Sequence, residues 1–85
     1  MLAERTRLVY EAKIQRHVLA NVEPGSLAHA LGLRTGDRLE AIDSTVIHDL
    51  DSALQAYARL QDADTLEVKI QRGTRWLDFE YTFVP

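Results

Sequence analysis

The chain has 85 residues, of which 46% are hydrophobic, and its formal net charge is −3 at pH 7. This length suits one small domain, and the acidic balance provides no basic field for nucleic acid or for an anionic membrane surface. Cysteine is absent, which excludes disulfides and thiolate chemistry, and no apolar run approaches the roughly 20 residues that span a bilayer. We therefore expect one domain with no nucleic-acid partner and no direct membrane insertion by this segment.

The N-terminal part of the chain shows the alternation of two strands. Every second residue from Leu8 to Ile14 is apolar, and this period of two predicts a first strand with one row of side chains against the core. Residues 18–22 predict a second strand, and the short link at residues 15–17 favours an antiparallel pair. We expect residues 1–6 to form an N-terminal extension and residues 7–84 to form the domain, as a module of a longer protein.

A short helix is predicted from Ser26 to Leu31, directly after a Pro-Gly pair that ends the second strand. The Ser26 hydroxyl can cap the first turn, and Gly32 followed by an apolar residue is the pattern of a left-handed C-terminal cap. Gly36-Asp37 could suggest a phosphate-binding loop, but the aspartate would repel an anion. We interpret it as a tight turn before a third strand at residues 39–42.

The C-terminal half predicts a longer helix and a final hairpin. Asp49 is the expected N-cap of a helix that stops near Gln61, and its apolar stripe has the three-and-four spacing of an amphipathic helix. Alternating residues predict strands over residues 66–71 and 77–83, joined by a hairpin with Gly73 in the left-handed position. The alternation places Trp76 on the outer face of the last strand. There it either covers neighbouring residues or contacts a partner.

Few polar side chains show a pattern that carries chemistry. His17, His29 and His48 lie in separate predicted elements without metal-ligand spacing, and we interpret them as surface histidines. Asp43, Ser44 and His48 supply the residue types of a catalytic triad, but adjacent side chains diverge and no nucleophile elbow accompanies them. We therefore expect no catalytic residue, no metal and no cofactor.

Residues 24–44 resemble a segment of bacterial PDZ domains. The order Pro-Gly-Ser, Ala, Gly-Leu, Gly-Asp and then Ile is similar to the "PGS-A-x-x-GL-x-x-GD" region of that family, with Asp43-Ser44 in place of the usual Asn-Gly. The resemblance implies the permuted PDZ fold, an α+β half-open antiparallel β-barrel of five to six strands with one short and one longer helix. Its expected core consists of Leu8, Leu19, Val22, Leu33, Leu39, Ile42, Val46, Leu66, Val68 and Phe79.

The resemblance also implies a peptide-binding groove. In a PDZ fold the first strand has a free edge facing the longer helix, and an extended peptide or protein segment adds there as one more antiparallel strand. The groove residues implied here are Leu8, Val9, Tyr10, Glu11 and Ala12 on the strand and Leu54, Tyr57 and Ala58 on the helix. Family members that bind free C-termini have a glycine-containing loop ahead of the strand, whereas this chain has Glu4-Arg5-Thr6-Arg7. We therefore expect binding without a strict need for a terminal carboxylate.

Two kinds of parent protein are suggested by different parts of the chain. Residues 49–56 and 60–73 resemble the PDZ region of type II secretion protein C, which implies an inner-membrane component with this domain on the periplasmic side. Residues 24–30 look more like the PDZ modules of HtrA-type serine proteases and site-2 metalloproteases. Three functions stay open: a non-catalytic binding module of a secretion or envelope assembly, a regulatory domain of a protease, and a purely structural docking domain.

Overall fold

Six strands and two helices follow one another in the computed structural model, which describes residues 5–60 and 63–83, apart from the side chains of Tyr57 and Leu60. In chain order they are β1 (Arg7–Glu11), β2 (Arg16–Ala20), α1 (Leu27–Ala30), β3 (Arg38–Ile42), β4 (Thr45–Val46), α2 (Leu50–Leu60), β5 (Thr65–Arg72) and β6 (Arg75–Thr82). Among the described residues, neither helix is long and apolar enough to cross a membrane.

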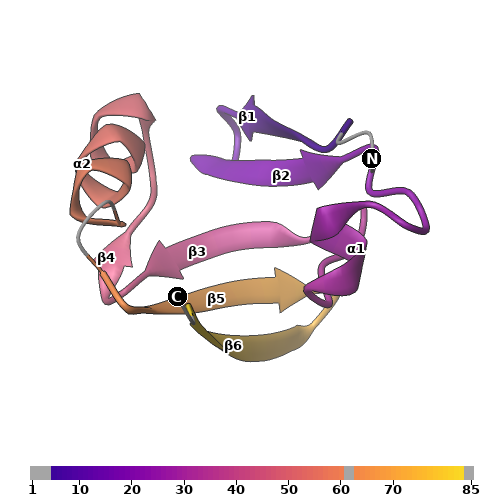
Figure 1. The fold of residues 1–85 in the computed structure, drawn as a ribbon. Coiled ribbons are helices and arrows are strands. Elements are labelled where there is room, and N and C mark those ends of the chain that lie inside the picture. The colour runs from indigo at the N-terminus through magenta and orange to yellow at the C-terminus, as the bar shows by residue number, and fades with distance from the viewer. Residues whose placement is uncertain (1–4, 61–62, 84–85) are drawn as a thin grey trace.

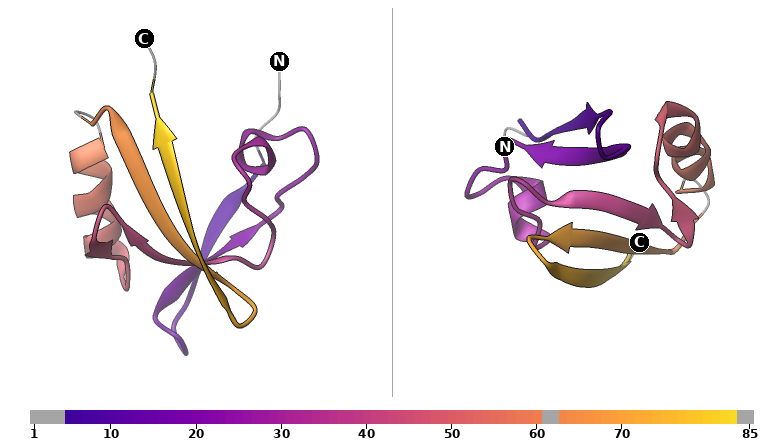
Figure 2. Two further views of the ribbon diagram at one scale, coloured as in Figure 1. Left: turned by 90° about the horizontal axis from the view of Figure 1, so that it is seen from below. Right: turned by 180° about the vertical axis from the view of Figure 1, so that it is seen from behind.

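The strands form one antiparallel sheet in the order β1-β2-β3-β5-β6, with β4 paired to β3. The sheet curves without closing, and the two helices stand at opposite ends of it (Figures 1 and 2). The curve turns one face of the sheet toward the helices, and the core lies on that face. This arrangement confirms the predicted α+β fold, a half-open barrel of six strands with one short and one longer helix.

The first hairpin differs from its prediction. The strand pair turns at residues 12–15, so β1 ends at Glu11 and His17 lies within β2 rather than in the link. The apolar alternation continues through the turn to Ile14, which made the strand look longer than it is. Gln15 takes a positive φ of 52° without being a glycine, and no turn residue in the sequence marks this position.

Both ends of α1 have the predicted caps. The Ser26 hydroxyl accepts the backbone N–H of His29 at 3.1 Å. At the other end the N–H groups of Gly32 and Leu33 donate to the carbonyls of His29 and Ala28, each at 3.0 Å, which is the hydrogen-bond pair of a Schellman motif. Gly32 has φ +93°, the left-handed conformation that this motif requires. The sequence prediction for this helix is confirmed.

The core is centred on β3, β5 and α2. Of the ten predicted core residues, Leu19, Leu39 and Val68 are buried, and Val22, Leu33, Ile42, Leu66 and Phe79 are partly buried. The prediction is wrong for Leu8, which is 53% exposed because β1 is an edge strand, and for Val46, which is 44% exposed. Val46 lies opposite Ala41 on the outer face, and the next residue, Ile47, is the one that is fully buried.

Candidate functional site

The outer edge of β1 has no strand beside it in the described part of the chain. Leu19 on β2 shows which main-chain groups face this edge, because its N–H donates to Asp37 at 2.9 Å and its carbonyl accepts from Gly36 at 2.8 Å, both away from β1. Leu19 is therefore in a non-hydrogen-bonded pair with Leu8, and such pairs alternate along an antiparallel ladder. It follows that the N–H and C=O groups of Leu8 and Tyr10 point to the free edge.

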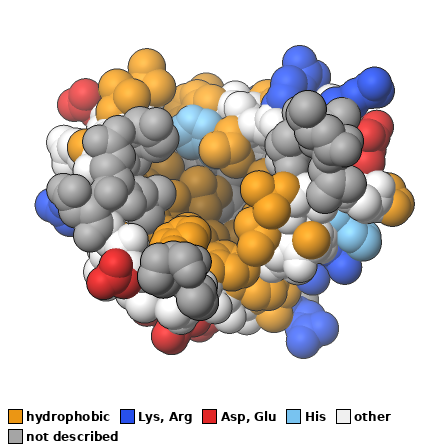
Figure 3. Space-filling view, in the orientation of Figure 1, with side chains coloured by type: hydrophobic (Ala, Val, Ile, Leu, Met, Phe, Trp, Pro, Cys, Tyr) orange, Lys and Arg blue, Asp and Glu red, His pale blue; other side chains and the backbone are white. Residues whose placement is uncertain are grey.

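The side chains of β1 divide between its two faces. Leu8 and Tyr10 lie opposite Leu19 and His17, on the inner side of the sheet. Although they face inward, both remain accessible at the edge, and Tyr10 is 43% exposed. Figure 3 shows apolar side chains gathered around a hollow on this side of the molecule. The other three side chains of β1, which are Arg7, Val9 and Glu11, are exposed on the outer face.

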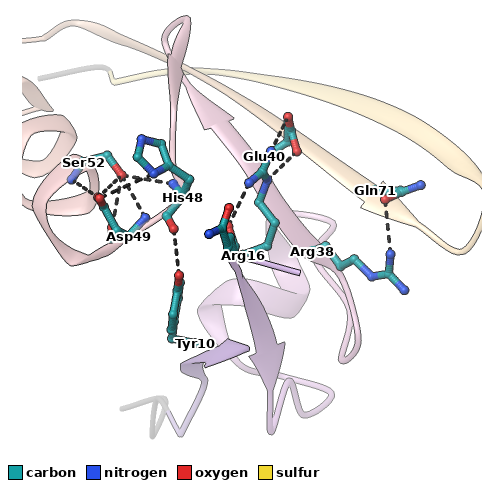
Figure 4. A network of polar contacts seen from close by, with 9 residues as sticks. Tyr10, Arg16, Arg38, Glu40, His48, Asp49, Ser52 and Gln71 are labelled. Atoms are coloured by element: carbon teal, nitrogen blue, oxygen red, sulfur yellow. Dashed lines mark hydrogen bonds and ion pairs between the residues drawn. The ribbon is translucent and has the colours of Figure 1, made fainter. Parts of the chain in front are cut away.

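A hydrogen bond connects β1 to the beginning of α2. The Tyr10 hydroxyl donates to the backbone carbonyl of His48 at 3.0 Å, so this end of β1 is held beside the start of the helix (Figure 4). Farther along α2, Leu54 is 57% exposed and Ala58 is also exposed. The structure therefore places the strand residues and the helix residues of the predicted groove on β1 and α2, except that Ala12 falls in the turn. The side chain of Tyr57 lies outside the described part of the structure.

The start of α2 is fixed by a compact cap. Asp49 Oδ1 accepts both the backbone N–H and the hydroxyl of Ser52 at 2.8 Å, and the Ser52 hydroxyl accepts the N–H of His48 at 3.0 Å (Figure 4). These bonds from the backbone and side chain of Ser52 lower the pKa of Asp49. The predicted N-cap is confirmed, and it gives the carbonyl that Tyr10 contacts a defined position.

An apolar recess of about 340 Å³ opens beside Leu8 at the other end of β1. Its walls come from the start of β1, from β2 and from α1 with the loop that follows it. Leu27 and Leu31 of this wall are exposed, and Leu33 is partly buried. An apolar side chain entering from the free edge would therefore meet aliphatic groups on several sides.

The prediction that His17 is a surface residue is wrong. His17 is 9% exposed, its ring lies 5.1 Å from the Tyr10 ring, and its buried Nδ1 has no hydrogen-bond partner among the described residues. The prediction failed because the hairpin turns earlier than the alternation suggested, and this moves residue 17 onto the inner face of β2.

The outer face of the sheet carries a polar network. Arg16 makes a paired contact with the carboxylate of Glu40, from Nε at 2.7 Å and from Nη2 at 3.1 Å (Figure 4). This contact lowers the pKa of Glu40 and raises that of Arg16.

Trp76 is 52% exposed on this face, as predicted, with the Lys69 ammonium 5.4 Å from the ring centroid. This is a cation–π contact between β6 and the neighbouring strand β5.

The residue types that suggested catalysis are used in turns. Asp43 and Ser44 both take positive φ and form the turn between β3 and β4, and Asp43 Oδ1 accepts the N–H of Glu67 at 2.8 Å. This is the place where the family pattern has Asn-Gly, and Asp tolerates the same left-handed conformation. Among the described residues no group of three or more His, Asp or Glu side chains is arranged to hold a metal ion.

A small antiparallel half-barrel with a free strand edge beside a helix is the architecture of a domain that accepts an extended segment. The family model of the PDZ domain matches residues 18–72, and the chain belongs to this family. PDZ domains are generally non-catalytic modules that bind peptide segments.

Solved structures agree with this assignment. The chain is similar to the PDZ domain of EpsC from Vibrio cholerae, residues 204-305, with a TM-score of 0.69 and 16% identity over 93% of this chain and 76% of that one. A second structure of that domain, residues 219-305, gives a TM-score of 0.65 and 16% identity over 93% of this chain and 92% of the other. At this identity the likeness concerns the fold. No curated protein matches the sequence.

Proposed function

We propose that this domain binds an extended peptide or protein segment by strand addition to the free edge of β1, without catalysing a reaction. The observation that carries the proposal is the pair of residues Leu8 and Tyr10, whose main-chain groups face the edge while their side chains face the apolar hollow. An added strand gains main-chain hydrogen bonds, and every second side chain of it enters the hollow.

We propose further that the parent is an inner-membrane component of type II secretion, with this domain on the periplasmic side. Two observations support this parent: the resemblance of residues 49–56 and 60–73 to the PDZ region of type II secretion protein C, and the structural likeness to the PDZ domain of EpsC. The alternative parent, an HtrA-type or site-2 protease, is favoured by residues 24–30. The full-length gene separates the two, through a membrane span without a protease motif or through a protease domain.

Binding is expected to be weak and to survive amidation of the peptide C-terminus. Main-chain hydrogen bonds each contribute about 0.5–1.5 kcal/mol net of water, so a short added strand should bind in the micromolar range or more weakly. Residues 4–7 contain no glycine to form an amide nest for a carboxylate. NMR shift mapping with free and amidated versions of one peptide measures this. Complete loss of binding on amidation would contradict it, as would shifts confined to the region around Trp76.

Proline substitutions provide a test of strand addition itself. Leu8→Pro removes an N–H that faces the free edge, so we expect a folded protein that binds an added strand at least about fivefold more weakly, from one lost hydrogen bond. Val9→Pro removes an N–H that belongs to the β1–β2 ladder, so it should lower the unfolding midpoint instead. Peptide titration and thermal unfolding of both variants measure the two effects.

A third variant, Leu8→Ala, controls for the lost side chain in this experiment. It keeps the N–H group and should bind better than Leu8→Pro. If Leu8→Pro binds as well as Leu8→Ala, main-chain pairing at this edge is not the mode of binding. A purely structural docking function, in which no peptide occupies the groove, would then be favoured.

A further inference from the structure

We infer that the segment added to β1 carries a charge order: a basic residue toward its N-terminus, apolar residues in the middle and an acidic residue toward its C-terminus. This inference rests on the proposed function and specifies the ligand of the same site. It comes from the register of β1, from the two faces of the strand and from the charges at its two ends.

The outer side chains of β1 run from positive to negative. Arg7 stands at the beginning of the strand, Val9 in the middle and Glu11 at the end, and all three are exposed on one face. Arg5 adds an exposed cation ahead of Arg7. At the opposite end, the bond from Tyr10 to His48 brings the start of α2 close, and Asp51 in its first turn is exposed.

Within the part of the chain that the structure describes, no ion pair engages Arg7 or Glu11, so both end charges are available to a partner on the open side. Glu11 lies opposite Arg16 within the hairpin, but that guanidinium is engaged in its paired contact with Glu40. Arg7 lies opposite Ala20, which offers no charge. On the neighbouring strand β2, the residue opposite Glu11 is therefore already paired, and the residue opposite Arg7 is apolar.

Antiparallel pairing converts these positions into a ligand sequence. Leu8 and Tyr10 would form the hydrogen-bonded pairs with the added strand, since their main-chain groups face it. Arg7, Val9 and Glu11 then fall in the non-hydrogen-bonded pairs, where opposing side chains come closest and opposite charges stabilise. Read from its N-terminus, the ligand strand meets Glu11 first and Arg7 last.

The middle of the ligand is set by the inner face and by Val9. The two ligand residues opposite Tyr10 and Leu8 point into the hollow, and the apolar recess beside Leu8 favours an aliphatic side chain there. The residue opposite Val9 is best β-branched. The resulting five-residue pattern is basic, apolar, β-branched, apolar, acidic, and Lys-Leu-Val-Leu-Asp is its simplest form.

Two capped peptides of identical composition test the charge order. The first is acetyl-Ser-Lys-Leu-Val-Leu-Asp-Ser-amide, and the second exchanges its Lys and Asp. Titrated into the isotopically labelled chain at low salt, the first should shift the amides of residues 8–10 and bind about 5- to 20-fold more tightly than the second, since two cross-strand charge pairs change sign. The difference should shrink at high salt, where exposed charges are screened.

Two protein variants complete the test. Arg7→Glu is expected to abolish the preference between the peptides, and Arg7→Glu combined with Glu11→Lys is expected to reverse it. Equal binding of the two peptides to the unmodified chain, or a preference that Arg7→Glu leaves intact, would overturn the charge order while strand addition stands. If neither peptide shifts residues 8–10, the proposed function fails together with this inference.

Discussion

Replacing Arg72 by methionine is expected to lower the free energy of unfolding by about 3–5 kcal/mol, because it leaves a buried carboxylate without its counter-charge. That carboxylate belongs to Asp37, which is 1% exposed. Arg72 donates to Asp37 Oδ1 from Nε and to Oδ2 from Nη2, each at 2.8 Å, and these bonds raise the pKa of the guanidinium. For a domain of this size the midpoint of thermal unfolding should fall by more than about 12 °C.

A double variant separates the buried charge from the lost packing of the arginine. Asp37→Asn keeps an oxygen that can accept the backbone N–H of Arg34, a bond of 2.8 Å in the native protein, but it carries no charge. Arg72→Met combined with Asp37→Asn should therefore be more stable than Arg72→Met alone. If the double variant is the less stable of the two, the buried charge is not the reason for the loss.

The ion pair of Asp37 and Arg72 could not be predicted from the sequence. The sequence predicts only a turn at Gly36-Asp37, and this turn is present, with Gly36 at φ +93°. The partner of Asp37 is 35 residues away at the end of β5, and no local pattern connects the two positions. Arg72 also donates to the carbonyl of Gly32 at 2.9 Å, so one side chain joins the end of α1, this turn and β5. Contacts of this kind depend on the folded topology.

Local signals predicted those elements whose ends are marked by specific residues. Ser26, Gly32, Asp49 and Gly73 each take the capping or turn role that their chemistry predicts, and the elements that they delimit were found. The hairpin at residues 12–15 has no such residue, and the sequence prediction of its position is wrong. Alternation alone cannot say where a strand ends, because a turn can continue the same pattern.

The candidate site was predictable in outline through the family resemblance. The order of the elements indicates which strand has the free edge. It does not indicate which residues of that strand turn their N–H and C=O groups toward the edge. That assignment needed the bonds of Leu19 to the turn at Gly36 and Asp37. Likewise, the availability of Glu11 depends on the contact of Arg16 with Glu40 across the sheet, which no local pattern in the sequence indicates.

Gly32→Val is the second substitution expected to have a large effect, a loss of about 2–5 kcal/mol of unfolding free energy. The left-handed conformation at φ +93° penalises any Cβ by about 1–2 kcal/mol. In addition, a Cβ on Gly32 would lie 3.2 Å from Cε1 of Phe79, so the ring would have to move, and overpacking of this kind costs about 1–3 kcal/mol. Chemical denaturation of the variant and the native chain measures the sum.

Two other glycines allow the backbone and packing contributions to be separated. Gly36 has the same φ of +93°, but a Cβ there would meet nothing within 4 Å, so Gly36→Val should cost only the backbone part. Gly73, at φ +61° and equally open, should accept asparagine with little loss, since asparagine tolerates this conformation. The expected order of stability is therefore Gly73→Asn, then Gly36→Val, then Gly32→Val. Equal stability of the two valine variants would show that the Phe79 ring yields without cost, and that backbone conformation alone restricts position 32 to glycine.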